Sequence, residues 1–417
     1  MTNRRAFLRG LAGAAGLALL PDAVRAASLA ATGAAADPVA AFDAAAARWP
    51  WLLATKGTGR DLDCESLAIE GRWPRDLRGR YWRNGPALFE RGGQRHGHWF
   101  DGDGMVQRFT LADGRVAHRG RLVRTRKLVE DAAAGAFRTP AFGLAGRPDA
   151  LVRGPDDVNV ANTSVIEHGG RVLALWEGGS AHALDAATVD TVGPVTWQDG
   201  WEQVPFSAHP KLDPQGTLWN FGSAGELAFF YEVGPDGRLV RGQAGRFGVP
   251  AGMAHDFAVT ERYFVVPLPP VALDIGAVTR GEPAERAFPW NPAEPLRIWV
   301  GEKADVSRSR VFELPAEVVF HVGNAYERDA RTIVLSYVGS ANNGFLQDDA
   351  RRVIRGDLVE RGGHHADAWQ LELDLANGTV RRTPLLSRTE FPRVHPHRVG
   401  RAARQLLAPA AWRDHEG

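Results

Sequence analysis

The chain has 417 residues, of which 50 are Lys or Arg and 49 are Asp or Glu, so its formal net charge is only +1. A nearly neutral chain without a basic tract gives no case for nucleic acid as a partner. The single cysteine, Cys64, excludes an intrachain disulfide, and we interpret it as a buried small residue rather than a reactive thiol.

The first 26 residues have the pattern of an export signal. Two arginines precede Phe-Leu within Asn3–Arg9, an apolar run follows over Gly10–Leu20, and small residues surround Ala26. This pattern is typical of the twin-arginine (Tat) route, so we expect cleavage near Ala26 and a periplasmic or other extracytoplasmic location. The alternative is an uncleaved membrane anchor, but the eleven apolar residues of the run are few for a span that needs about 20.

Two short segments lead from this signal to the body of the protein. Residues 27–37 are rich in alanine and are expected to form a linker. Residues 38–53 predict a helix because Phe42, Ala46 and Trp49 recur on one side, followed by two leucines. The helix lacks the Lys/Arg-rich polar face of an interfacial anchor, so peripheral membrane contact is the less favoured alternative.

Residues 38–417 are expected to form a single all-β domain. Turns that contain glycine recur along them, as at Asp113-Gly114 and Asn377-Gly378. The strand-like runs between the turns include Arg171–Trp176, Tyr263–Val266, Arg297–Val300 and Trp369–Leu375. The presence of 47 Gly and 26 Pro with few long helical patterns favours a β-propeller over an α/β fold. The number of blades is not fixed by composition, because the sequence has no clean internal repeat.

Three histidines of this body occupy similar settings. His209, His255 and His321 each lie where a loop or apolar run meets the start of a strand, and they are 46 and 66 residues apart. Propeller blades of ~40–50 residues send one inner end toward a shared axis, where the imidazoles would meet. Imidazoles without a nearby cysteine suit a first-row metal such as Fe(II). From spacing alone, ordinary loop or core histidines are the more common case.

Other candidate residues are assigned no chemistry. The segment Phe100–Gly104 has the Asp-x-Asp-Gly core of a calcium loop, but it lacks the acidic ligand at the required later position. We interpret it as a tight structural turn. The pair His364 and His365 lies in a polar loop and is expected to be exposed to solvent, and His96 and His98 precede an apolar strand.

The residues that flank the three histidines carry a family resemblance. They read Ala-His-Pro-Lys-Leu-Asp-Pro at His209, Met-Ala-His-Asp-Phe-Ala-Val-Thr at His255 and Phe-His-Val-Gly-Asn-Ala-Tyr at His321. These segments resemble those around the first three iron ligands of the carotenoid cleavage oxygenase family, which includes retinoid isomerohydrolase and the stilbene-cleaving dioxygenases. Further matches, in the expected order, lie at Arg83–Pro86, His98–Met105, Asn162-Thr163, Leu175–Gly179 and Glu390–Pro392.

The resemblance implies both a fold and a chemistry. The fold is a seven-bladed β-propeller with the N-terminal helix packed on its outside. The site is an Fe(II) held by His209, His255 and His321, with Glu177 and Glu390 placed to hydrogen-bond the distal nitrogens of ligating histidines. Such a site adds both atoms of O₂ across a conjugated C=C bond of a carotenoid, apocarotenoid or stilbene and gives two carbonyl products. The absence of a Ser/His/Asp or nucleophile-elbow signature agrees with chemistry that needs no protein nucleophile.

The C-terminal part of the sequence departs from the family pattern. The family places a fourth histidine in a Pro-x-Gly-Phe-His-Gly type segment, whereas the match here fades after Arg401. Neither His395, His397 nor His415 lies in such a segment. We therefore expect an incomplete propeller and a site without its fourth ligand. Two alternatives to the dioxygenase stay open: a catalytically impaired member that only binds an apolar polyene, and an isomerase of retinoid esters.

Overall fold

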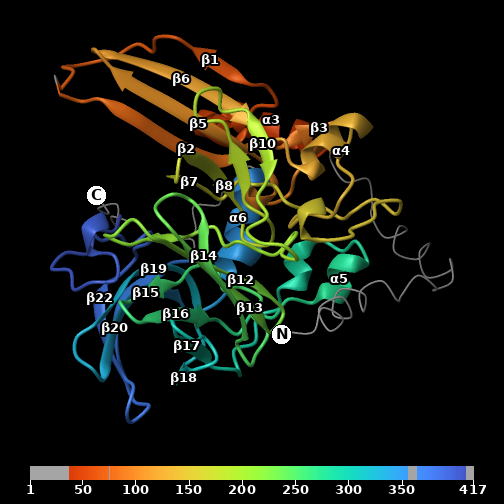
Figure 1. Cartoon of the computed structure of the whole chain (residues 1–417). Helices are drawn as coiled ribbons and strands as arrows, with labels where there is room; N and C mark the ends of the chain where they lie inside the picture. Colours follow the sequence, from red (N-terminus) through yellow and green to blue (C-terminus); the bar gives the residue numbers. More distant parts are fainter. Residues whose placement is uncertain (1–36, 75, 356–363, 410–417) are drawn as a thin grey trace, which may run out of the picture.

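The computed structural model describes residues 37–74, 76–355 and 364–409 (Figure 1). The expected signal over residues 1–26 and all but the last residue of the expected linker lie outside this range, as does His415.

Two short helices lead into the body, α3 (Pro38–Arg48) and the 3-10 helix η1 (Pro50–Thr55). The Asp37 carboxylate caps α3, because it accepts hydrogen bonds from backbone N–H groups of the first turn. Trp49 precedes a proline, and its φ of −126° and ψ of 82° end α3. The single helix predicted over residues 38–53 is therefore wrong in its second half, where the proline divides it into two helices.

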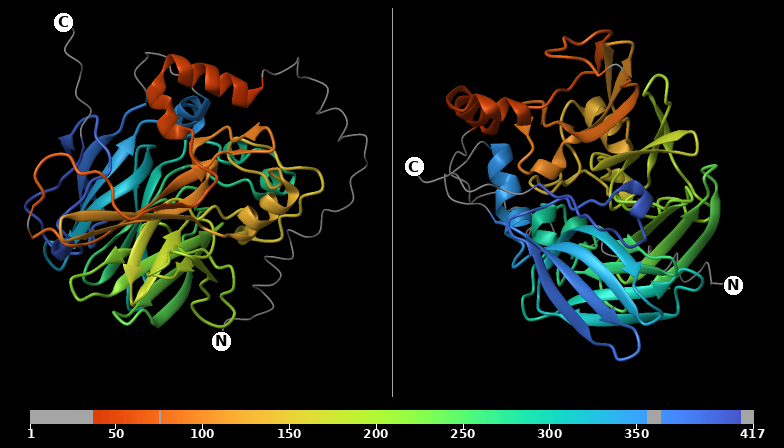
Figure 2. Two further views of the ribbon diagram at one scale, coloured as in Figure 1. Left: turned by 90° about the horizontal axis from the view of Figure 1, so that it is seen from above. Right: turned by 90° about the vertical axis from the view of Figure 1, so that its left-hand side faces the viewer.

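Helix α3 packs at the periphery of the body against α6 (Ala350–Arg355), as both views of Figure 2 show. Its Phe42 and Ala46 side chains are buried as predicted, and the Arg95 guanidinium lies 3.5 Å from the centre of the Phe42 ring. Trp49 is 40% exposed, so its predicted place on the buried side is wrong. In the described part of the chain, no helix is both long and apolar enough to cross a membrane.

Five four-stranded antiparallel sheets form the body, and we number them I to V in chain order. Sheet I contains β1 (Leu62–Cys64), β6 (Arg115–Leu122), β5 (Asp103–Ala112) and β2 (Gly79–Leu88), in that order. Sheet II contains β10 (Thr191–Pro194), β9 (His182–Leu184), β8 (Arg171–Leu175) and β7 (Ser164–His168). Sheet III contains β11 (Lys211–Leu212), β12 (Leu218–Ala224), β13 (Leu227–Val233) and β14 (Leu239–Arg246).

Sheet IV contains β15 (Ala258–Val259), β16 (Tyr263–Leu268), β17 (Leu296–Glu302) and β18 (Ser309–Leu314). Sheet V contains β19 (Val318–Glu327), β20 (Thr332–Ser340), β21 (Asp367–Asp374) and β22 (Val380–Leu386). The remaining elements are the hairpin β3 (Glu90–Arg91) and β4 (Gln94–Arg95), the α-helices α4 (Arg126–Ala134) and α5 (Ile275–Thr279), and the short helical turns η2 (Trp99–Asp101), η3 (Pro155–Asp157), η4 (Ala284–Ala287), η5 (Phe345–Asp349) and η6 (Pro396–Arg398).

Sheets II to V are antiparallel meanders, whereas in sheet I the first strand, β1, pairs with the last strand, β6. Consecutive four-stranded antiparallel sheets are the blades of a propeller, so the predicted all-β propeller class is confirmed. The resemblance implies seven blades, and the described residues form five four-stranded sheets. The strands predicted around Arg171, Tyr263, Arg297 and Trp369 correspond to β8, β16, β17 and β21. Side chains alternate between the two faces of a strand. A strand that lies between two neighbouring blades therefore packs one set of alternate side chains against each of them.

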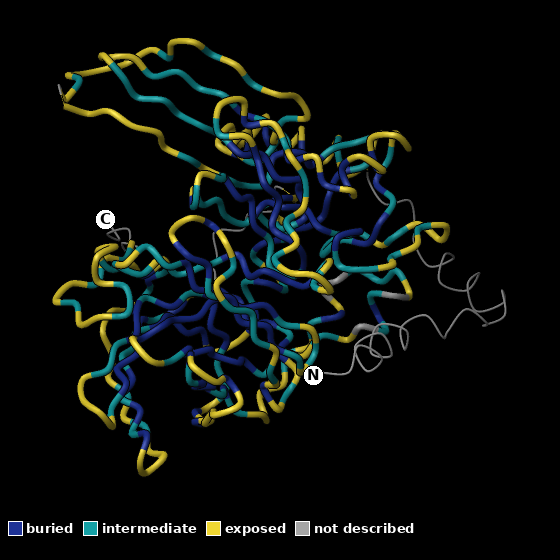
Figure 3. The backbone as a smooth tube through the Cα atoms, in the orientation of Figure 1, coloured by how far each residue is buried: buried dark blue, intermediate teal, exposed yellow. Residues whose placement is uncertain are grey.

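Strand β8 illustrates how the core is built. Leu173 and Leu175 lie in the apolar cluster between sheets II and III, whereas Val172 and Ala174 lie in the cluster between sheets I and II. All four are buried, so the strand is apolar from Val172 to Leu175. The core therefore consists of layers between blades. Figure 3 shows in dark blue the chain segments whose residues are buried, most of them in the interior of the body.

Cys64 lies in β1, the outer edge strand of sheet I, and is partly exposed. The prediction that it is buried is wrong, because an edge strand has a neighbour on one side only. Figures 1 and 3 show the outer part of this sheet reaching away from the rest of the body.

Candidate metal centre

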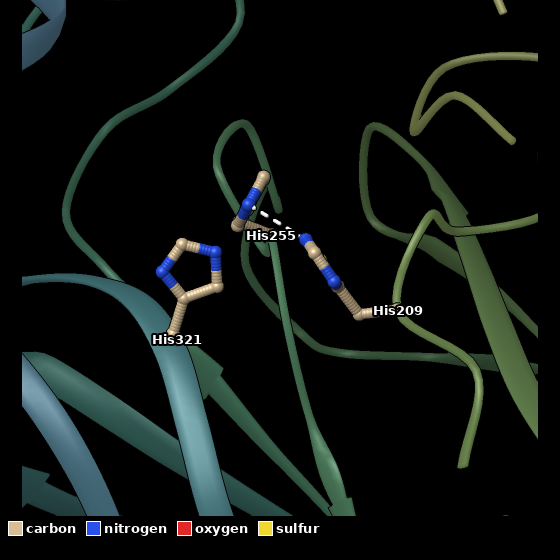
Figure 4. Close-up of side chains that lie close together, drawn as sticks. All are labelled: His209, His255 and His321. Carbon is tan, nitrogen blue, oxygen red and sulfur yellow. Dashed lines mark hydrogen bonds between the residues drawn. The ribbon is translucent and has the colours of Figure 1, made fainter. Parts of the chain in front are cut away.

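Three histidines converge from neighbouring sheets. His209 precedes β11 of sheet III, His255 precedes β15 of sheet IV, and His321 lies within β19 of sheet V. One ring nitrogen from each lies within 4.8 Å of the others, and Nε2 of His209 is 2.9 Å from Nε2 of His255. Figure 4 shows the three rings directed toward one another from three separate segments. The three residues predicted as metal ligands are thus neighbours in space.

A β-bulge places the His321 side chain. The pairing register between β19 and β20 shifts on both sides of Val322, and such a bulge bends a strand and changes the direction of a side chain. Gly323 follows, and a Cβ atom there would lie 2.7 Å from Oγ of Ser336. The absence of a side chain at this position lets the bulge lie close against β20.

The backbone before His209 is held by two neighbouring strands. The Asn220 amide of β12 donates to the Ser207 carbonyl oxygen over 2.9 Å. The Ser164 hydroxyl of β7 donates to the Ala208 carbonyl oxygen. These bonds connect sheets II and III immediately before the histidine, so its position depends on the packing of two blades.

Two carboxylates lie behind the histidine rings. Nδ1 of His255 is 2.8 Å from Oε1 of Glu177, and Nδ1 of His321 is 2.7 Å from Oε2 of Glu390. An Nδ1–H that donates to a carboxylate leaves the lone pair on Nε2, the tautomer required of an Nε2 metal ligand. The Thr163 hydroxyl donates to the other oxygen of Glu177 over 3.3 Å. Sequence reasoning placed Thr163 in a matched segment and assigned it no role.

Burial and charge set the protonation of the cluster. Burial alone would raise the pKa of Glu177, but the attraction and hydrogen bond of His255 hold it below its ordinary value. Burial alone would lower the pKa of His255, and Glu177 more than offsets this and raises it. Burial, and then the other two histidines, lower the pKa of His209 well below its usual range. His209 is therefore neutral at physiological pH, as a metal ligand must be.

The donor set fits a divalent first-row metal. His255 and His321 each have their Nδ1 proton directed to a carboxylate, which leaves a lone pair on each Nε2. Converging lone pairs repel one another unless a cation or a shared proton lies between them. Imidazole nitrogens are suitable ligands for iron, copper, nickel and zinc. These three rings would therefore hold such an ion, with Glu177 and Glu390 orienting two of them.

The Glu390 segment carries backbone strain beside the site. Phe391 has φ of +51°, a left-handed conformation that is uncommon for an aromatic residue. Its N–H donates to Glu390 over 2.6 Å, and its ring centre is 4.5 Å from that of His321. Hydrogen bonds to the end of the described chain fix this segment. The Thr389 hydroxyl donates to the Pro409 carbonyl oxygen, and Arg393 forms an antiparallel bridge with Leu407. Strained residues of this kind are concentrated at functional sites.

The other histidines that the sequence singled out lie elsewhere. His395 and His397 are exposed and stack on each other with ring centres 5.3 Å apart. His98 is buried, with Nε2 2.9 Å from the Leu346 carbonyl oxygen. His96 is buried against the Phe137 ring. Within the described residues, the cluster around His255 therefore consists of three histidines.

Two further interpretations concern acidic loops. The Asp101 carboxylate accepts hydrogen bonds from the N–H groups of Phe142 and Gly143, which is the structural role predicted for that turn. His364 is exposed as predicted, and it forms a second group with Asp348 and Asp349.

A guanidinium already partners this second group. Arg352 lies 3.4 Å from Asp348 and 3.7 Å from Asp349. The group is therefore at least partly neutralised without a metal.

The fold and the histidine cluster together define a β-propeller protein with three converging histidines that could hold a metal ion. The family model described as retinal pigment epithelial membrane protein matches residues 57–414. The chain belongs to this family, the carotenoid cleavage oxygenases. The resemblance read from the three histidine segments is confirmed, and with it the assignment to a family of oxygenase enzymes.

The chain is similar to several characterised proteins. It is 32% identical over 390 residues to apocarotenoid-15,15′-oxygenase of Synechocystis, a match that covers 87% of this chain and 76% of that protein. It is 30% identical over 348 residues to isoeugenol monooxygenase of Pseudomonas nitroreducens, with 78% of this chain and 68% of that protein covered. It is 29% identical over 297 residues to resveratrol cleavage oxygenase 1 of Aspergillus fumigatus, with coverages of 68% and 57%.

Solved structures show the same likeness. The cobalt-substituted apocarotenoid oxygenase of Synechocystis superimposes with a TM-score of 0.76 at 30% identity, over 87% of this chain and 78% of that chain. The propeller architecture is therefore shared with this cobalt-substituted apocarotenoid oxygenase.

Proposed function

We propose that the protein is an Fe(II)-dependent dioxygenase that cleaves a conjugated C=C bond of an apolar small molecule, with O₂ as co-substrate. The substrate class is a carotenoid, an apocarotenoid or a stilbene-like compound. The observation that carries the proposal is the convergence of His209, His255 and His321, two of them backed by carboxylates. A bound ferrous ion would supply the redox chemistry by which both atoms of O₂ are added across the double bond.

The residues of the chain contribute positioning. Glu177 and Glu390 hold the Nδ1 protons of two histidines and thereby fix their tautomer and ring orientation. The bulge around Val322 keeps His321 directed toward the other two rings. No described contact provides a protein nucleophile for the substrate, and none is needed when the oxidant is O₂.

The surroundings of the cluster favour an apolar substrate. The Phe320 ring centre lies 5.4 Å from that of His255 and 5.6 Å from that of Phe345. The Phe345 ring packs against the Phe100 ring, and the Phe100 ring packs against the Phe142 ring. A continuous set of aromatic rings thus extends away from the site. Aromatic packing of this kind excludes water from this side of the site, which favours an apolar substrate.

The metal and the substrate class can be tested together. The protein, loaded with Fe(II) without oxygen, is supplied with ¹⁸O₂ and, in separate reactions, with an apocarotenal, resveratrol, isoeugenol or a retinoid ester. We expect cleavage of at least one substrate into two carbonyl products, each with one ¹⁸O atom, and no cleavage by the His255→Ala variant. Binding of a polyene without turnover by the fully loaded protein would instead support an inactive binding member. An isomerised but uncleaved retinoid ester would support the isomerase.

A further inference from the structure

A single buried carboxylate joins the three histidine segments. Asp256 is 2% exposed, and its Oδ1 accepts hydrogen bonds from Nζ of Lys211 over 2.6 Å and from the N–H of Phe257 over 2.7 Å. Its Oδ2 accepts from the N–H of Val322 over 2.8 Å. Both oxygens are thus occupied, by donors from three different sheets or the loops that lead into them.

Each of these groups is a close sequence neighbour of a histidine. Lys211 comes two residues after His209, Asp256 directly follows His255, and Val322 directly follows His321. The carboxylate therefore connects sheets III, IV and V within two residues of each histidine. Its bonds fix the three segments relative to one another at the site, in addition to the packing between the blades.

The bulge in β19 supplies one of these connections. The ladder register shifts on both sides of Val322, and its N–H is directed to Asp256. The same distortion that orients His321 therefore also presents a backbone donor to the carboxylate. The two features are parts of one arrangement.

Burial of the charged Lys211 and Asp256 side chains costs solvation free energy. The side chains are 11% and 1% exposed, so both charges have lost most of their water. Such a pair is retained without a large penalty only when the geometry is good and the remaining lone pairs are hydrogen-bonded, as they are here. Charge-assisted hydrogen bonds are also shorter and stronger than neutral ones, which makes the connection stiff.

We propose that Asp256 is a positioning residue that sets the spacing of the three histidine ligands through Lys211 and Val322. The inference rests on the proposed metal site and deepens it. Residues that orient ligands without binding the metal change its affinity by about 10–100-fold when they are replaced. We expect Asp256→Asn to weaken metal binding to this extent and to change the coordination geometry.

The experiment uses Co(II), whose visible absorption reports its coordination geometry. The full-length protein is titrated with Co(II) alone, and the affinity and the spectrum are recorded. Asp256→Asn should bind Co(II) about 10–100-fold more weakly, with shifted absorption bands. The double variant Lys211→Met, Asp256→Leu removes the same connections without leaving a buried charge, so it should show the same spectral change even if Asp256→Asn folds poorly.

A matched control lies in α4, outside the three sheets that carry the histidines. Asp131 is 1% exposed, accepts from Nζ of Lys127 over 2.8 Å and accepts from the N–H of Arg138 over 2.9 Å. Asp131→Asn therefore removes a buried carboxylate with the same kinds of partner. It should lower the thermal unfolding midpoint while leaving the Co(II) affinity and spectrum unchanged.

The outcomes separate this inference from the proposed function. If the folded double variant has the Co(II) affinity and spectrum of the wild type, the positioning role of Asp256 is wrong and the metal site stands. An equal change in the spectrum of Asp131→Asn would also overturn it, because loss of stability alone would then suffice. If the wild type gives the same Co(II) spectrum as His209→Ala, the metal site itself is wrong, and the inference falls with it.

Discussion

His98 makes the stability of the protein depend on pH in a predictable way. Burial, and then the nearby Arg351 and Arg355 guanidinium groups of α6, lower its pKa from 6.5 to about 4, although a hydrogen bond to the Leu346 carbonyl oxygen acts in the opposite direction. Both ring nitrogens are engaged in the neutral form. Nε2 lies 2.9 Å from that carbonyl oxygen, and Nδ1 accepts from the N–H of Phe100 over 3.1 Å. A proton on Nδ1 would point at the N–H of Phe100, so protonation of His98 would break this hydrogen bond.

The magnitude follows from the two pKa values. Because the folded pKa is the lower one, the unfolded chain binds the proton first as the pH falls below 6.5. The contribution of His98 to the free energy of unfolding is therefore constant above pH 6.5. It falls as the pH drops from 6.5 to about 4, and it is constant again below that. At 1.36 kcal/mol per pKa unit, the loss across this window is about 3 kcal/mol.

The assay is urea unfolding at a series of pH values between 7.5 and 4. His98→Gln cannot be protonated, so the free energy of unfolding should fall less steeply for this variant than for the wild type, with a difference of about 3 kcal/mol across the window. Other titrating groups are common to both proteins and cancel in the difference. His397→Gln, at an exposed position, is the control and should follow the wild type. Parallel curves for the wild type and His98→Gln would refute the reasoning.

Three further predictions concern other parts of the chain. Glu177→Gln should weaken iron retention by about 10–100-fold, measured by competition with a chelator, because the neutral amide orients its histidine less strongly. Glu327 accepts three hydrogen bonds, two of them from Arg262 and one from Thr260. Glu327→Gln should lower the free energy of unfolding by about 1–2 kcal/mol, a modest amount because Arg262 is exposed to solvent. These bonds hold the pKa of Glu327 below 4.5 despite its burial, so the cost should be complete above pH 4.5 and vanish as the pH falls through the folded pKa. Replacement of Arg4 and Arg5 by lysine should retain the protein in the cytoplasm, as seen by cell fractionation.

For each of these three predictions, one experimental outcome would contradict it. A Glu313→Gln variant, altered at an exposed ion pair with Arg297, should retain iron fully, and equal retention by Glu177→Gln would show that its carboxylate is not needed. A cost of Glu327→Gln that persists unchanged at pH 3 would contradict the role of its charge. Unchanged export of the double lysine variant would exclude the twin-arginine route.

The local sequence was sufficient for the strands and for the histidine segments. The run Arg171–Trp176 is apolar on both faces after its arginine and lies between turns, so its strand could be placed without the structure. The break of the first helix also had a signal, because Trp49 precedes a proline and pre-proline residues disfavour the helical region. The apolar periodicity of residues 38–53 continues across this signal, so it predicts one helix where the proline makes two.

The geometry of the site could not be predicted in the same way. A bulge depends on the register between β19 and β20, which no local pattern around Val322 encodes. The Lys211–Asp256 pair joins residues 45 positions apart. Each residue lies next to a predicted histidine ligand, and no local pattern indicates that the two side chains meet. The exposure of Cys64 depends on its edge position in sheet I, which follows from the strand order and not from the residue.

The central claim is that His209, His255 and His321 hold one ferrous ion. Its most direct test is the iron content of the full-length protein after loading with Fe(II) without oxygen and removal of excess metal, measured by mass spectrometry of the metal for the wild type, for each histidine replaced by alanine, and for His397→Ala. The account predicts about one iron per chain in the wild type and in His397→Ala, and loss of iron from each of the other three variants. Full iron content in any of those three variants would contradict it.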